Sequence, residues 1–178
     1  MSPKEIYVSV DIETAGPIPG EFSMLTIGAC DAYRPDQTFE CKLKPINENY
    51  DPAALAVTGL SLENLAREGA LPNEAMSRFA EWMNSLCAEN EKPVFVGFNA
   101  PFDWSFVNYY FHRFGKENPF GFTALDIKAL YMGASGRTWS ETSSRQIAER
   151  LNPDLSGDHD ALHDALYQAE IFRLVQAM

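Results

Sequence analysis

The sequence predicts an α/β fold in which helices cover the faces of a mixed β-sheet. Three strand-like segments come first, and helical segments then alternate with further short strands. This order is typical of a sheet with helices packed on its faces. A length of 178 residues suits one domain, and the chain shows no repeat, low-complexity stretch or linker. Residues 1–178 are therefore predicted to form a single domain.

The first three strands are indicated by alternation and by turn residues. Apolar Ile6, Val8, Val10 and Ile12 alternate with Tyr7, Ser9, Asp11 and Glu13, the pattern of a strand with one buried face. Residues 15–20 are rich in glycine and proline and predict a loop. A second strand is expected over Met24–Asp31 and a third over Thr38–Leu43, with Pro35-Asp36 in the hairpin turn between them.

The remaining elements follow from capping residues and apolar spacing. Asp51 and Pro52 predict an N-cap and the first position of a helix that ends at Thr58-Gly59. Apolar residues over Pro72–Leu86 recur at helical spacing, and the apolar run Pro93–Phe98 is typical of a central strand. Further elements are expected in chain order: a helix over Phe102–Phe114, a strand over Phe122–Leu125, a helix over Asp126–Tyr131, a helix from Ser143 or Ser144 to Leu151, and a last helix from Asp160 onward.

Charge and cysteine content limit the classes of function. The chain carries 25 acidic and 14 basic residues, a net charge of −11, which argues against a protein that coats long nucleic acids. It argues less against one that holds a chain end through bound cations, since two divalent ions offset four negative charges. Cys30, Cys41 and Cys87 are widely spaced and predict free thiols in a reducing cytoplasm. No apolar stretch approaches the roughly 20 residues of a membrane-spanning helix, so no membrane association is expected.

Asp11 and Glu13, at the end of the first strand, are the first candidate for chemistry. Side chains two apart on a strand project to the same side, so these carboxylates lie together. Two such groups can share metal ions that act on a phosphodiester. Two solvated acids at an exposed strand end explain this pair equally well when it is taken alone.

Two later segments carry further candidates. Asp103 follows the buried strand in the sequence Asn99-Ala-Pro-Phe-Asp103, where it serves as a helix N-cap, as a ligand at the carboxyl end of the strand, or as both. Asp164 lies in the last helix, and His159 lies at or just before its start. An imidazole has a pKa of about 6.5 and is suited to take a proton from water. His163 is the alternative base, although it is expected to point elsewhere.

These three segments together resemble the DEDDh exonucleases, the relatives of the proofreading subunit of bacterial replicative polymerase, of oligoribonuclease and of ribonuclease T. The resemblance rests on Asp11-Ile-Glu13, Asn99-x-x-Phe-Asp103 and His159-x-x-x-x-Asp164, in this order and spacing, and on Val57-Thr-Gly-Leu60 between the first two. It spans nearly the whole chain and implies a ribonuclease-H-like mixed five-stranded sheet flanked by helices. It further implies a metal-dependent 3'–5' exonuclease that releases nucleoside 5'-monophosphates from single-stranded DNA or RNA.

The same resemblance implies the roles of individual residues. Asp11, Glu13, Asp103 and Asp164 would hold two Mg²⁺ or Mn²⁺ ions, which suit oxygen ligands, and His159 would be the general base. Thr14, Ala15, Asn99 and Phe102 are the expected substrate-binding residues, with core packing as an alternative role for Phe102. Gly133–Ser144 is predicted to be a mobile loop that contains Arg137 and Trp139. These two residues either bind a nucleic-acid strand near the site, or belong to a solvated loop in which Trp139 packs on the protein.

Two other functions stay open. One is a catalytically silent binding module with the same fold, which the strong acidity favours and the complete set of catalytic positions opposes. The other is a ribonuclease-H-like endonuclease. The sequence leaves open the choice between DNA and RNA, the substrate length, the physiological pathway and the oligomeric state, for which the resemblance suggests a homodimer.

Overall fold

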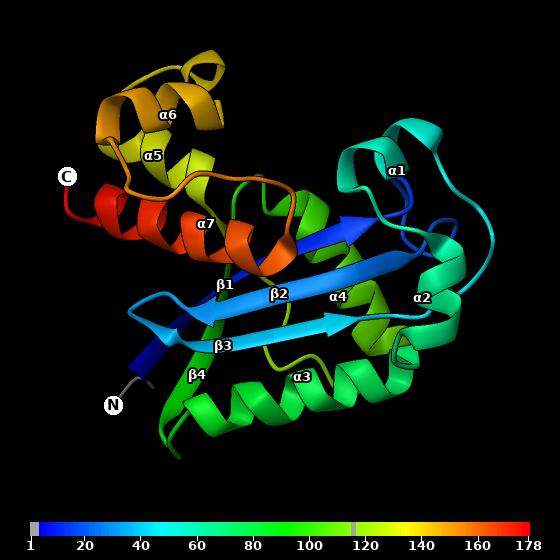
Figure 1. Ribbon diagram of the computed structural model, residues 1–178. Coiled ribbons are helices and arrows are strands. Elements are labelled where there is room, and N and C mark those ends of the chain that lie inside the picture. Colours follow the sequence, from blue (N-terminus) through cyan, green and yellow to red (C-terminus); the bar gives the residue numbers. More distant parts are fainter. Residues whose placement is uncertain (1–3, 115–116) are drawn as a thin grey trace.

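A mixed five-stranded sheet forms the centre of the structure, a computed structural model that describes residues 4–114 and 117–178 (Figure 1). The strand order is β3-β2-β1-β4-β5, with β1 antiparallel to β2, β2 antiparallel to β3, and β4 parallel to both β1 and β5. This arrangement confirms the predicted mixed sheet. The strands are β1 (Lys4–Thr14), β2 (Met24–Asp31), β3 (Arg34–Lys42), β4 (Glu91–Gly97) and β5 (Ala124–Asp126).

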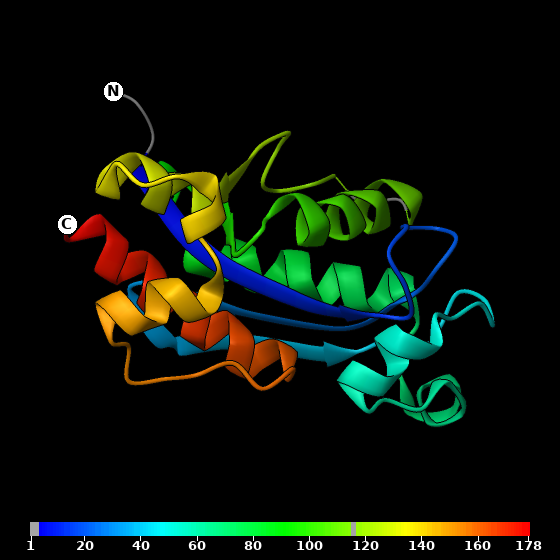
Figure 2. The same ribbon diagram turned by 90° about the horizontal axis from the view of Figure 1, so that it is seen from above.

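Helices cover both faces of the sheet and one of its ends. Figure 1 shows α7 and α3 on opposite sides of the strands, and Figure 2 shows α5, α6 and α7 gathered at one end of the molecule with α1 and α2 at the other. The helices are α1 (Pro52–Thr58), α2 (Leu62–Glu68), α3 (Pro72–Leu86), α4 (Pro101–Arg113), α5 (Ile127–Ser135), α6 (Ser144–Leu151) and α7 (Ala161–Gln176).

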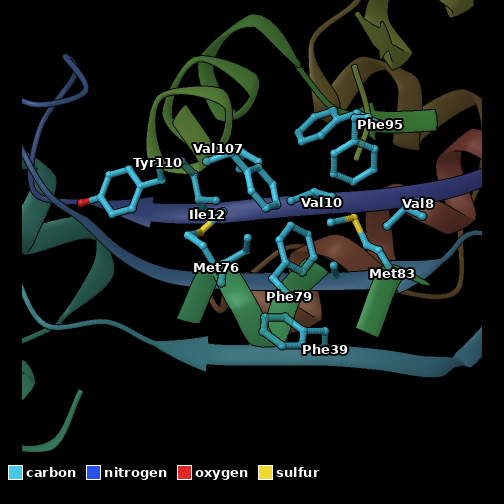
Figure 3. Packing of buried hydrophobic residues seen from close by; sticks show 14 of the residues in the cluster. Val8, Val10, Ile12, Phe39, Met76, Phe79, Met83, Phe95, Val107 and Tyr110 are labelled. Atoms are coloured by element: carbon cyan, nitrogen blue, oxygen red, sulfur yellow. The ribbon is translucent and has the colours of Figure 1, made fainter. Parts of the chain in front are cut away.

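The main core determines which face of β1 carries the polar residues. Val8, Val10 and Ile12 of β1 are buried and belong to one apolar cluster with residues of α3 and α4 (Figure 3). Because successive side chains of a strand alternate between faces, Asp11 and Glu13 project to the opposite face, on which α7 packs. The labelled partners of β1 in this cluster are Phe39, Met76, Phe79, Met83, Phe95, Val107 and Tyr110.

The hairpin between β2 and β3 turns earlier than predicted. The carboxylate of Asp31 accepts hydrogen bonds from the backbone N–H groups of Tyr33 and Arg34, at 2.8 and 3.0 Å, and pairs with the Arg34 guanidinium at 2.7 Å. These contacts close the turn at residues 32–33, so the prediction of a turn at Pro35-Asp36 is wrong. Proline is tolerated in β3 because this strand lies at the edge of the sheet.

The segment Gly133–Ser144, which was predicted to be a mobile loop, contains the end of a helix and a short 3₁₀ helix. Helix α5 continues to Ser135 and ends at Gly136, whose φ of 67° is the left-handed conformation common at helix ends. A 3₁₀ helix follows over Trp139–Glu141, and the side chains of Thr138 and Glu141 form a reciprocal capping box at its start. Local hydrogen bonds therefore organise a segment whose Gly, Ser and Thr content predicted mobility.

Arg137 and Trp139 have partners inside this part of the chain. The guanidinium of Arg137 lies 2.8 Å from a carboxylate oxygen of Glu141, and the Lys128 ammonium lies 4.3 Å from the centre of the Trp139 ring. The Trp139 side chain nevertheless stays exposed. These contacts account for both residues without a nucleic-acid strand.

Strand β3 begins at Arg34, four residues before the predicted start, and α5 ends at Ser135, four residues after the predicted end. The remaining predicted strands and helices begin and end within two residues of the observed ones. The side chain of Ser61 caps a further helix, α2, by accepting a hydrogen bond from the N–H of Asn64. Cys30, Cys41 and Cys87 are free thiols, as predicted. None of the helices in the described ranges is both long enough and apolar enough to cross a bilayer.

Candidate active site

A glycine allows α7 to approach the two acids of β1. Gly28 of β2 pairs with Asp11, and a Cβ atom at Gly28 would lie 2.2 Å from backbone atoms of Ala161 and Leu162. Any side chain at this position would push the start of α7 away from the sheet. Because Gly28 has no Cβ atom, the first turn of α7 can pack close to Asp11.

Asp164, in that first turn, organises the segment that carries His159. One oxygen of its carboxylate accepts the N–H of Asp158 at 2.9 Å, and the other accepts the N–H of His159 at 3.1 Å. His159 adopts a left-handed φ of 66°, which these two hydrogen bonds help to hold. Glu13, His159 and Asp164 each present a ligand atom within 4.8 Å of the others, so the structure brings these three predicted residues together.

Asp11 is held by a residue that the sequence did not single out. The amide nitrogen of Gln168 donates to a carboxylate oxygen of Asp11, and the amide oxygen of Gln168 accepts the N–H of Phe98 at 2.8 Å. Gln168 is 5% exposed and stands one turn after Asp164 on the same face of α7. It fixes the Asp11 carboxylate and ties α7 to the end of β4. The one feature of the sequence that could have pointed to Gln168 is its spacing of four residues from Asp164, which places both on one face of a helix.

Asp103 approaches the same site from α4. This helix begins at Pro101 and its N-cap is Ala100, so the alternative role of Asp103 as an N-cap is wrong. The carboxylate is buried and accepts the N–H of Ile12 at 3.2 Å, which ties it to β1 between the two acids of that strand. Asp126, which the sequence also did not single out, accepts the N–H of Ala100 at 2.7 Å and holds the start of α4.

These side chains surround one hollow of about 430 Å³. Its lining includes seven of the predicted site residues and also Gln168 and Tyr167, whereas Thr14 and Ala15 do not line it. Both are buried, and the N–H of Ala15 donates to the carbonyl of Ser23 at 2.8 Å. The predicted residues in the lining are Asp11, Glu13, Asn99, Phe102, Asp103, His159 and Asp164.

The two histidines of the last motif take different positions. His159 lines the hollow, whereas His163 does not. The Nδ1 atom of His163 lies 2.9 Å from a carboxylate oxygen of Asp158, and this contact raises the pKa of His163. The geometry therefore favours His159 over His163 as the group that meets a substrate.

Burial and, to a smaller extent, mutual repulsion disfavour the charged form of the carboxylates in the site. Burial, followed by the charges of Asp164 and Asp160, raises the pKa of Glu13 to about 7. Burial also raises the pKa of Asp103 to about 8 and that of Asp11 well above its ordinary value, where Asp103 adds to the effect. Cations that enter such a site stabilise it by offsetting the negative charge, and hard divalent ions suit its oxygen ligands.

Comparisons of sequence identify the family. A family model described as an exonuclease, RNase_T, matches residues 8–172, so the chain belongs to this exonuclease family. It is 59% identical over 175 residues to the 3'-5' DNA exonuclease Cap18 of Escherichia coli, covering 98% of this chain and 94% of that protein. It is 29% identical over 179 residues to Ribonuclease T of Histophilus somni (strain 129Pt), covering 93% of this chain and 80% of that protein.

Comparisons of structure agree on the fold. The nuclease domain of 3'hExo, a DEDDh family member bound to rAMP, matches with a TM-score of 0.79 and 17% identity over 96% of this chain and 92% of that one. E. coli ExoI in its complex with single-stranded DNA matches with a TM-score of 0.73 and 17% identity over 98% of this chain and 41% of that one. The sequence comparisons make this protein a 3'–5' exonuclease, and the solved exonuclease structures share its fold.

Proposed function

We propose that this exonuclease hydrolyses single-stranded nucleic acid from the 3' end, with two divalent metal ions and His159 as general base. The observation that carries the proposal is the meeting of five residues in one hollow. Asp11 and Glu13 come from β1, Asp103 from α4, and His159 and Asp164 from the start of α7. All of them belong to one chain, which we treat as a single exonuclease domain over residues 1–178.

The donor set fits Mg²⁺ or Mn²⁺. Asp11, Glu13, Asp103 and Asp164 offer only carboxylate oxygens, which these hard ions prefer. Burial, together with neighbouring negative charge, raises the pKa of Glu13 and of Asp103, and two divalent ions would offset that charge. When bound, the ions supply Lewis-acid stabilisation of the phosphate and of the departing 3'-oxygen.

The side chains themselves position the reactants and move one proton. His159 accepts a proton from the water that attacks the phosphorus atom, as its place in the lining allows. The water oxygen forms a bond to phosphorus while the bond between phosphorus and the 3'-oxygen breaks. The 3'-oxygen takes up a proton from solvent and becomes the new 3'-hydroxyl of the strand, and a nucleoside 5'-monophosphate leaves. Gln168 keeps Asp11 in place during this step through its hydrogen bond to the carboxylate.

The substrate end lies in the same hollow. Phe102 and Asn99 line it and are the proposed contacts to the terminal nucleotide. For Thr14 and Ala15 a substrate contact stays a prediction, because neither residue lines the hollow. We propose DNA as the preferred strand, because the relative with 59% identity is a DNA exonuclease.

The test is a time course on 5'-labelled single-stranded DNA and RNA of matched sequence, with Mn²⁺ and with EDTA. The expected result is a ladder that shortens from the 3' end, faster on DNA, and that EDTA abolishes. The same DNA with a blocked 3' end separates the alternatives, since an endonuclease cleaves it and an exonuclease stalls. Intact strands in every Mn²⁺ reaction would refute the proposal in favour of a silent binding module.

A further inference from the structure

A second, smaller hollow of about 90 Å³ adjoins the active site. Glu13 and His159 line both hollows. A row of side chains leads from the active site into the smaller one, because Glu13 of β1 pairs with Thr26 of β2, and Thr26 pairs with Lys42 of β3. Directly paired residues on neighbouring strands project from the same face. The row therefore runs from a metal-ligating acid to a cation at the edge of the sheet.

Thr26, in the middle of this row, carries a hydroxyl group that lacks a partner. The residue is 7% exposed, and its Oγ1 atom makes no hydrogen bond within the part of the chain that the structure describes. Buried polar groups are nearly always hydrogen-bonded, so an exception requires an explanation. A ligand that entered the adjoining hollow would supply a partner for this hydroxyl group.

Lys42 is a free cation at the end of the row. It is exposed and takes part in none of the ion pairs formed among residues 4–114 and 117–178. Glu40 and Asp160 also line the hollow, and the Asp160 carboxylate is engaged with the N–H of His163 at 3.0 Å. Lys42 lines two further hollows, of about 250 and 370 Å³, and the larger one includes Arg78. The cations Lys42 and Arg78 thus lie in the larger of these hollows together with the acids Glu40 and Glu68.

We propose that Lys42 and Thr26 form a second phosphate subsite, which binds a substrate phosphate other than the one being hydrolysed. The hollow is too small for a nucleoside, given that pockets for such ligands are usually about 300 Å³ or more. An ammonium and a hydroxyl group are suitable donors for phosphate oxygens. The phosphate has two sources, the phosphodiester one nucleotide upstream or a phosphate on the 3' end. This inference rests on the proposed function.

Three thymidine substrates test it. TpT contains only the scissile phosphate, TpTpT adds an upstream phosphodiester, and TpTp adds a 3'-phosphate. We expect the kcat/KM of the unaltered protein to be roughly ten-fold higher on one of the longer substrates than on TpT, the scale of one charge-assisted hydrogen bond. TpTpT as the better substrate identifies the upstream source, and TpTp identifies the terminal one.

The variants Lys42→Ala and Thr26→Val are expected to lose this preference. Thr26→Val removes an unpaired hydroxyl group at nearly constant shape, so its thermal unfolding temperature should not fall. Lys92→Ala, an exposed lysine on β4, is the matched control and should keep the preference. Lys42→Ala should also reduce the slope of log Kd against log salt for a longer strand by about 0.7, whereas Thr26→Val should not.

Failure of the inference and failure of the proposed function give different results. No hydrolysis of TpT with Mn²⁺ by the unaltered protein contradicts the proposed function. Hydrolysis of all three substrates with an unchanged preference in Lys42→Ala overturns the phosphate subsite. An equal loss on all three substrates also overturns it, because Lys42 would then act by offsetting the neighbouring carboxylates.

Discussion

Replacing Gly28 with alanine tests whether the close packing of α7 on the sheet determines the geometry of the site. The new Cβ atom would lie 2.2 Å from the backbone of Ala161 and Leu162, whereas ordinary contacts begin at 3.4 Å. The first turn of α7 must therefore move by about 1 Å, and it carries Asp164 with it. A displacement of about 1 Å in a catalytic group lowers the rate by roughly 10²-fold. Overpacking of this kind also destabilises a fold by about 1–3 kcal/mol.

The assay measures kcat/KM with Mn²⁺ together with urea unfolding of the metal-free protein. Gly133→Ala is the control, because Gly133 is exposed in α5 and a Cβ atom there meets nothing within 4 Å. We expect Gly28→Ala to remain folded, with a fall in kcat/KM of about 10²-fold, and the control to be unaffected. Near-normal turnover in Gly28→Ala would refute the reasoning, since α7 would then tolerate displacement from the sheet.

Three further predictions concern the carboxylates and the base. Gln168→Leu should lower activity by about 10–100-fold and weaken metal affinity, measured by Mn²⁺ titration, because the amide that orients Asp11 is lost; unchanged affinity and rate would remove that role. His159→Ala should lower kcat by about 10²–10⁴-fold while His163→Ala stays near normal, and the reverse result would reassign the base. Because the pKa of Glu13 is raised from 4.5 to about 7, the folded chain binds more protons than the unfolded chain between these values. The stability of the metal-free protein should therefore fall as the pH rises through this window, as urea unfolding in EDTA can show, and a rise in stability would contradict it.

Local patterns in the sequence predicted those parts of the fold that depend on short-range chemistry. The alternation in β1 put Asp11 and Glu13 on one face, and the structure places both on the side of α7. Asp51 and Pro52 predicted the start of α1 at the observed residue. In the turn after β2 the same approach failed, because the side chain of Asp31 closes the turn before the proline that composition favours.

The supporting residues of the site could not be predicted in this way. Gln168 matters because α7 docks where its amide meets both Asp11 and the N–H of Phe98. Gly28 matters because the start of the same helix crosses β2 at that position. Each role depends on the register of the strands and on the position at which α7 packs on the sheet, which are properties of the assembled fold. The family resemblance supplied the acids and His159, but no motif in the sequence marked either support.

The strong negative charge of the chain and its activity on an anionic polymer are compatible because of how the cations are used. Arg34, Arg137 and Arg150 pair with carboxylates of the protein itself, which leaves them little charge to offer a phosphate. Burial and neighbouring carboxylates raise the pKa of Asp11 and of Glu13, and in their charged form these groups would repel a phosphate unless cations came between them. Binding and hydrolysis would therefore share one requirement, the entry of divalent ions. Among the described residues no lysine or arginine lines the active-site hollow, whereas Lys42 lines the smaller hollow beside it.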